Sequence, residues 1–173
     1  FAHGGDRTLA NAVTVNNGTT NGFQGDHSLS FAGGMNFAAT TGTTTFNNNL
    51  AAGKTLTIQG IAANSLAGNG LWTVDGSGTT VVSGGFSTAT PHGLGIVKAG
   101  QGTLELGGGN FNRSGAAIEI DNGVLRMGAD NVIQANATSG GILFTPEGPN
   151  GKVATLARAE PIENGTVLIR DGR

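Results

Sequence analysis

The sequence predicts an all-β fold in which the chain winds into a parallel β-helix of about seven coils. Helical periodicity is nearly absent, because apolar residues alternate at period two and Gly, Asn, Asp or Pro interrupts them every few residues. A short phrase, Ser/Thr-Leu-x-apolar between glycines, recurs at residues 25–33, 53–60 and 98–107, and a related phrase occupies 122–128. The leucines of these phrases are 27, 48 and 21 positions apart, which fits a repeat unit of roughly 20 to 27 residues.

Short strands joined by turns account for almost the whole chain. Each is expected to have about three to six residues. They centre on Val13 and Val15, Leu29 and Phe31, Thr43 to Phe46, Leu56 and Ile58, Leu71 to Val74, Thr80 to Val82, Ile96 and Val97, Leu104 and Leu106, Ile118 and Ile120, Val124 and Leu125, Ile142 to Phe144, Val153 to Leu156, and Val167 to Ile169.

Asn-Gly and Asp-Gly dipeptides supply the positive backbone dihedrals that tight corners need. They occur at residues 17–18, 21–22, 69–70, 75–76, 122–123, 150–151 and 164–165. The same dipeptides suit antiparallel hairpins, so an antiparallel β-sandwich is the alternative fold. The recurrence of similar phrases at coil-like spacing favours the β-helix.

In a β-helix, equivalent residues of successive coils stack on one another. We therefore expect one inward apolar column of Leu29, Leu56, Leu104 and Leu125, and a second row of Phe31, Ile58 and Leu106. Residues 1–137 are assigned to these coils. Three prolines and more charge distinguish residues 138–173, which we expect to be a looser final coil, a cap or a junction to the next segment.

Composition excludes several classes of function. The 173 residues include 32 glycines, no cysteine, no tyrosine and one tryptophan, and the net charge is −2. The nine basic residues are scattered and form no cluster, so nucleic acid is not an expected partner. No apolar run approaches the roughly 20 residues of a membrane-spanning helix, so we expect no membrane contact by this segment. The chain begins at Phe1 without a signal segment, and we expect it to be an internal piece of a longer protein.

Three acids are the candidates for chemistry. Glu119 and Asp121 alternate, so they share one strand face, and Glu105 could sit one coil away. Some β-helix enzymes mount pairs of acids on an outer face to cleave polysaccharides. Arg113 and Arg126 could pair with these acids, and a solvated, salt-bridged patch is the favoured interpretation.

The remaining motifs do not predict a site. Gly53-Lys54-Thr55 matches the end of a phosphate-binding loop, but Asn48 stands where that loop needs glycine. His3, His27 and His92 are far apart and have no ligand spacing. We therefore expect no cofactor, no metal and no catalytic residue.

Two further polar or aromatic features also have structural interpretations. Trp72 is expected to fill the core or a corner. The runs Thr40 to Thr45 and Asn47 to Asn49 do not recur at one spacing, so β-propensity explains them better than an outer binding ladder.

The segment from Lys98 to Gly128 carries a family resemblance. Its pattern, Lys-x-Gly-x-Gly-Thr-Leu-x-Leu-Gly followed by Asn-Gly-Val-Leu at 122–125, resembles the autotransporter-associated β-strand repeat. The resemblance implies a right-handed β-helical stalk, exported through a C-terminal outer-membrane barrel that is not part of this chain. The family shares no catalytic residues. Departures from its pattern at Gly115 to Ala117, Glu119 and Asp121 affect the surface more than the fold.

Three functions are open at this point. The favoured one is a non-enzymatic stalk or adhesin segment at the bacterial cell surface or secreted, which contacts a host or matrix protein or glycan through polar faces. The second is a unit that associates with itself through open strand edges into extracellular fibres. The third is a polysaccharide-active enzyme using Glu105, Glu119 and Asp121.

Overall fold

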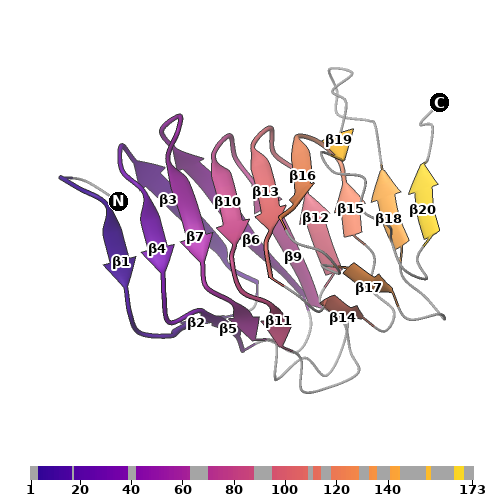
Figure 1. Cartoon of the computed structure of the whole chain (residues 1–173), viewed down its shortest axis with the longest axis horizontal. Helices are drawn as coiled ribbons and strands as arrows, with labels where there is room; N and C mark the ends of the chain where they lie inside the picture. The colour runs from indigo at the N-terminus through magenta and orange to yellow at the C-terminus, as the bar shows by residue number, and fades with distance from the viewer. Residues whose placement is uncertain are drawn as a thin grey trace.

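The protein is a parallel β-solenoid, the fold class that the sequence predicts (Figure 1). The computed structural model describes residues 4–16, 18–38, 42–62, 70–87, 95–108, 111–113, 118–128, 133–135, 141–144, 155–156 and 166–169. Every strand pair among these residues is parallel, which excludes the antiparallel sandwich. The strands stack side by side along the long axis of the molecule, from the N-terminal end to the C-terminal end.

Two sheets of seven strands face each other across the core. Sheet B contains β1 (Arg7–Leu9), β4 (Leu29–Phe31), β7 (Thr55–Ile58), β10 (Thr79–Val82), β13 (Thr103–Leu106), β16 (Val124–Met127) and β19 (Thr155–Leu156). Sheet A contains β3 (Thr20–Gly25), β6 (Gly42–Leu50), β9 (Gly70–Asp75), β12 (Gly95–Lys98), β15 (Ile118–Ile120), β18 (Gly141–Phe144) and β20 (Thr166–Ile169).

Two smaller sheets close the third side. Sheet C contains β2 (Val13–Val15), β5 (Met35–Phe37), β8 (Ile61–Ala62) and β11 (Phe86–Ser87), and a separate pair contains β14 (Phe111–Arg113) and β17 (Ile133–Ala135). Four turns, β1 to β12, therefore pass through sheets B, C and A in order. This count of complete turns differs slightly from the expected seven coils, although both long sheets have seven strands.

The predicted leucine column exists, with one addition. Leu29 pairs with Leu56, and Leu104 pairs with Leu125, in register along sheet B. Thr80 stands between Leu56 and Leu104. The 48-residue gap in the sequence is thus two coils of 24 residues, and the middle coil lacks the leucine that would have revealed it. The second row is also confirmed, since Phe31 pairs with Ile58, and Leu106 is buried in the same row.

Aromatic rings fill the interior of the first coils. Trp72 is fully buried, as predicted, and packs edge-to-face on Phe46 at 5.5 Å and on Phe37 at 6.1 Å between ring centroids. Phe23 contacts Phe31 and Phe46 in the same group. In the later coils the core is aliphatic, and consists of Ile96, Leu104, Leu106, Ile118, Ile120 and Leu125. Large aromatic area buried at one end and aliphatic area at the other stabilise the same backbone.

The turn dipeptides divide into two groups. Gly18, Gly76 and Gly123 have positive φ values of 69°, 92° and 78°, as the turn prediction requires. Asn21-Gly22, by contrast, lies inside β3, so that turn prediction is wrong. The side chain of Asn21 bonds to Thr19 there, while the backbone pairs with β6.

The proposed change of character after residue 137 stays a prediction. Most of 138–173 lies outside the described residues, and β18 and β20 continue sheet A with parallel pairing. Within the described part of the chain, no helix has the length and apolar character needed to cross a bilayer.

Candidate functional site

Hydroxyl side chains stand in rows on the outer faces of both long sheets. On sheet B, Thr55, Thr79 and Thr103 are paired in register, and Ser30 pairs with Thr57. On sheet A, the outer row is Thr20, Thr45 and Thr73. The threonine and asparagine runs at 40–45 and 47–49 did not reveal these rows, because each row takes a single threonine from each of several coils. Asn48, in the middle of the second run, points inward and is fully buried.

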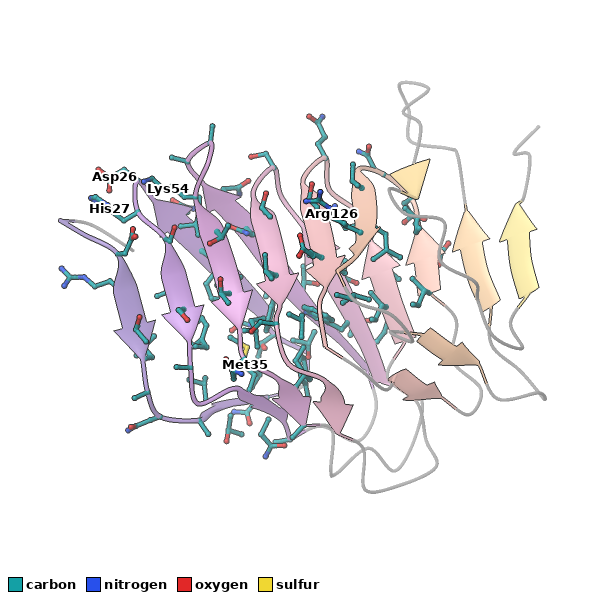
Figure 2. The ribbon with its side chains drawn as sticks, in the orientation of Figure 1. Asp26, His27, Met35, Lys54 and Arg126 are labelled. Atoms are coloured by element: carbon teal, nitrogen blue, oxygen red, sulfur yellow. The ribbon has the colours of Figure 1, made fainter. Side chains whose placement is uncertain are left out.

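The three candidate acids do not converge. Glu119 is on β15 of sheet A and Asp121 follows it, whereas Glu105 is on β13 of sheet B, across the core. Glu105 therefore lies on a different sheet from Glu119, and not one coil away from it in the same sheet. Glu105 instead pairs with Arg126 on the neighbouring strand, at 3.5 Å, and Figure 2 shows Arg126 at the outer surface. Arg113 lies on β14, and its side chain is outside the described residues.

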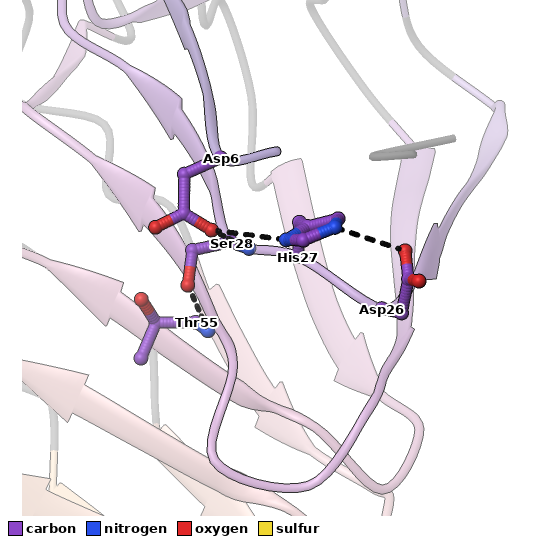
Figure 3. Close-up of polar contacts among 5 residues, drawn as sticks. All are labelled: Asp6, Asp26, His27, Ser28 and Thr55. Atoms are coloured by element: carbon purple, nitrogen blue, oxygen red, sulfur yellow. Dashed lines mark hydrogen bonds and ion pairs between the residues drawn. The ribbon is translucent and has the colours of Figure 1, made fainter. Parts of the chain in front are cut away.

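His27 lies between two aspartates where the chain passes from sheet A to sheet B (Figure 3). Its Nδ1 is 3.7 Å from an Asp6 oxygen and its Nε2 is 3.6 Å from an Asp26 oxygen. Asp6 also accepts the backbone N–H of Ser28 at 2.8 Å, and the Ser28 hydroxyl accepts the N–H of Thr55 at 3.2 Å. Ser28 is thus bonded to the backbone of a neighbouring coil, which is not the serine-histidine contact that nucleophilic catalysis needs.

Lys54 and the histidines complete the sequence candidates. Lys54 follows β6 and precedes β7, a strand, so the helix that a phosphate-binding loop requires is missing at this place. Figure 2 shows Lys54, Asp26 and His27 at the same end of the first strands. His3 and His92 lie outside the described residues. No group of three His, Cys, Asp or Glu side chains able to hold a metal ion occurs in the part of the chain that the structure describes.

The A–B corner is where the chain passes from sheet A to sheet B. It consists of residues 26–28, 51–54, 76–78, 99–102 and 121–123. Polar side chains of the adjoining strands are buried on the inner side of this corner. The Asn48 amide donates to the Thr79 carbonyl at 2.9 Å and to the Thr80 hydroxyl at 3.0 Å, and its oxygen accepts the N–H of Leu50 at 3.2 Å. These bonds satisfy a buried threonine inside the leucine column.

Lys98, the first residue of the family-like motif, is buried in the same corner. Only 1% of it is exposed, and its Nζ donates to the carbonyl of Gly100. Burial lowers the pKa of Lys98 from 10.5 to about 8, although the negative charge of Asp75 partly opposes this change. A Cβ on Gly123 would lie 2.4 Å from the carbonyls of Gly100 and Gly102 and 2.9 Å from Nζ, so the glycine leaves room for the ammonium group.

The B–C corner is where the chain passes from sheet B to sheet C. It consists of residues 10–12, 32–34, 59–60 and 83–85, most of which are small. A groove lies at this corner. The groove is a cavity of about 290 Å³. Backbone bonds from Val13, Met35 and Ile61 to the carbonyls of the next coil pass beneath it, at 3.1, 2.9 and 3.3 Å. Its lining residues are Ala12, Ala32, Gly33, Gly34, Met35, Asn36, Gln59, Gly60, Ile61, Ala62 and Gly85.

No family model matches the chain, and comparisons with curated proteins and with solved structures found no match either. The functional argument therefore depends on the geometry above and on the motif at 98–128.

Sequence reasoning missed three features of these corners. Asn48 and Lys98 are polar residues inside the core. Period two from Phe46 and Leu50 places Asn48 on the inward face of β6, but its polar side chain within a run of three asparagines concealed this. The available signal for Lys98 was its position just before Gly100 and Gly102, since glycines next to a lone lysine can leave room for its side chain to contact the backbone. The groove had no local signal, because its wall is assembled from four coils.

Proposed function

We propose that this chain is a non-enzymatic segment of the β-solenoid stalk of an exported bacterial surface protein, of the autotransporter passenger type. The observation that carries the proposal is the segment from Lys98 to Gly128. Its motif residues begin at the end of β12 and reach β16 on the next coil, and Gly100, Gly102 and Gly123 each pack against backbone atoms of an adjacent coil. The motif therefore matches the family resemblance in sequence and has a physical purpose in this fold.

The geometry suits a spacer. Each coil of about 24 residues adds about 4.8 Å to the rod and contacts its neighbours in register. A chain of this kind folds coil by coil, which favours export through a narrow barrel. Its location would be the bacterial cell surface or the secreted fraction.

The outer faces support an adhesive role better than catalysis. They present threonine rows and few charges, and the acids that hydrolysis would need stand on different sheets. A host or matrix protein or glycan would meet these faces.

Surface display tests this proposal. The chain is fused between a signal segment and an autotransporter barrel and produced in a Gram-negative host. We expect it to reach the outside of intact cells, where an antibody and an added protease detect it. A matched Gly102→Val fusion, with its coil stacking broken, should be displayed less. Retention of the unaltered fusion inside the cell, with the empty barrel fusion displayed, would contradict the proposal.

Self-assembly is a second candidate, favoured by the position of β1 as the outermost strand of sheet B in the described part of the chain. This strand is at the end of sheet B, and its Leu9 is 44% exposed, although Phe31 beside it in register is buried. An unpaired parallel edge with an apolar residue is a surface for another coil.

Light scattering on dilution separates this candidate from the stalk. Assembly predicts rods whose length falls on dilution, and Leu9→Lys should abolish them. A stable monomer at all concentrations removes the second candidate and leaves the first.

A further inference from the structure

The groove at the B–C corner is long and narrow. Gly33, Gly34, Gly60 and Gly85 form its floor, and Ala12 extends it to the first coil. These residues come from four successive coils, so the groove runs along the rod for about 14 Å, three steps of 4.8 Å. Most of its other lining residues are glycine and alanine, which make the base mostly apolar, and the side chains of Met35 and Ile61, 4% and 1% exposed, lie in the core beneath it.

One polar group in the groove has an unmet hydrogen bond. The Oδ1 atom of Asn36 is buried and has no partner, and no hydrogen bond joins the amide to another described residue. A buried acceptor without a donor is rare in native proteins, because its lost bond to water is not replaced. Asn36 is one of the residues that line the groove, so a donor group of a bound ligand can supply the missing hydrogen bond.

The lining carries no charge. Among the described residues that line it, the polar side chains are Asn36 and Gln59, and none is Asp, Glu, Lys or Arg. A charged ligand would leave water for this surface without gaining an ion pair, which is unfavourable. The groove therefore selects an uncharged ligand that donates hydrogen bonds.

We propose that this groove binds an uncharged glycan chain. A sugar ring combines hydroxyl donors with apolar C–H faces, and these match the Asn36 oxygen and the apolar base. The elongated shape fits several linked rings. A peptide is disfavoured, because strand addition needs free backbone groups, and the N–H groups of Met35 and Ile61 are already bonded to Gly60 and Gly85.

This inference rests on the proposed surface role, which would bring the groove into contact with external glycans. It deepens that role by assigning the adhesive contact to one corner of the rod. The two are separable by experiment. Display of the fusion without glycan binding overturns the groove alone, and failed display with glycan binding overturns the export proposal alone.

The test is titration of the purified chain with neutral gluco-, manno- and galacto-oligosaccharides, followed by calorimetry and backbone NMR. Ala62→Leu fills the groove beside Asn36, its register partner. Asn36→Leu removes the acceptor. We expect Asn36→Leu to lower the affinity about tenfold, the value of one lost hydrogen bond in a desolvated site. Ala62→Leu should lower it at least as much, because the larger side chain occupies the space of the ligand. The matched control, Ala51→Leu, adds the same side chain at an exposed position of the A–B corner and should leave the affinity unchanged.

Thermal unfolding separates binding from folding. Asn36→Leu should leave the midpoint unchanged or raise it, because it removes an unsatisfied buried group. Binding lost together with a large drop in the midpoint of both groove variants would contradict the proposal. So would binding to none of the oligosaccharides, binding that survives both changes, or binding to unstructured peptides instead.

Discussion

The two corners of the solenoid on either side of sheet B solve the same stacking problem differently. At the A–B corner, side chains inside the coil donate to backbone carbonyls, as Asn48 does to Thr79 and Lys98 does to Gly100. Backbone N–H groups bond to carbonyls of an adjacent coil at both corners, as Gly102 does to Gly76 and Met35 does to Gly60. Among the described residues, the B–C corner has these backbone bonds but no fully buried polar side chain beside them. Polar side chains thus enter this core where they bond to backbone carbonyls of Thr79 and Gly100.

Glycine substitutions at both corners should have the largest effect. A Cβ on Gly84 would lie 1.6 Å from the carbonyl of Gln59, and one on Gly102 would lie 2.0 Å from the carbonyl of Gly78. Because these contacts are with backbone, we expect Gly84→Ala and Gly102→Ala each to lower the free energy of unfolding by about 3 kcal/mol or more. Urea unfolding followed by the fluorescence of the single Trp72 measures this change.

Two further alanine variants serve as controls. Gly22 has open space around it, so Gly22→Ala should change stability by less than about 1 kcal/mol. Gly53 is also open but has a φ of +76°, so Gly53→Ala should cost about 1 to 2 kcal/mol from backbone strain alone. If Gly102→Ala is no worse than Gly53→Ala, close contact does not limit the A–B corner.

Asn48→Ala should destabilise the A–B corner next most strongly. It leaves the Thr80 hydroxyl, the Thr79 carbonyl and the Leu50 N–H without their partner. We expect a loss of about 2 to 4 kcal/mol in the same unfolding measurement. Asn49→Ala, one residue away on the exposed face, should cost less than about 1 kcal/mol. Equal losses for the two variants would show that the buried amide has no special role.

The lowered pKa of Lys98 predicts that the free energy of unfolding rises with pH between about 8 and 10.5. In this window the unfolded chain, with a lysine pKa of 10.5, binds more protons than the folded chain, with a pKa of about 8. Deprotonation therefore favours folding as the pH increases, by up to about 3 kcal/mol.

The chain suits this measurement, because it has no tyrosine or cysteine and only three lysines, Lys54, Lys98 and Lys152. The free energy of unfolding is measured in urea at each pH. Lys98→Met should remove the slope, and Lys54→Met should keep it. A slope that persists in Lys98→Met would assign it to another group.

The ion pair on the outer face of sheet B should matter least. Glu105 and Arg126 are 28% and 61% exposed, so water and salt screen their attraction. We expect Glu105→Gln to change the free energy of unfolding by less than about 0.5 kcal/mol, and added salt to reduce that difference further. A loss of several kcal/mol would mean that the pair holds the adjacent coils together.

The sequence predicted the fold class and most strands of the two long sheets, because glycine-bracketed leucine phrases repeat at coil spacing. It did not predict β1, β3, β5, β8, β11, β14 or β17. The strands β8 and β11 have two residues each, too few to show a period, and β3 contains an Asn-Gly dipeptide that favours a turn. The coil at Thr80 was hidden because a threonine bonded to Asn48 replaces the expected leucine.

The candidate site was harder to predict than the fold. The sequence placed Glu119 and Asp121 on one face, but the position of Glu105 depended on which strands share a sheet. The groove forms only where four coils are adjacent. The Oδ1 atom of Asn36 stands out because no hydrogen-bond donor contacts it. Neither property can be expressed by spacing along one chain.

The bond between Asn48 and Thr80 also distinguishes correct from incorrect assembly. The leucine phrases are nearly interchangeable, so apolar packing alone would let one coil settle on the wrong neighbour or slip along it. Asn48 and Thr80 are 32 residues apart, and the hydrogen bond forms when their two coils meet in the native alignment. In a shifted alignment the buried Asn48 amide would lose its bonds to Thr79 and Thr80. The pair therefore stabilises the native alignment of these coils over the alternatives.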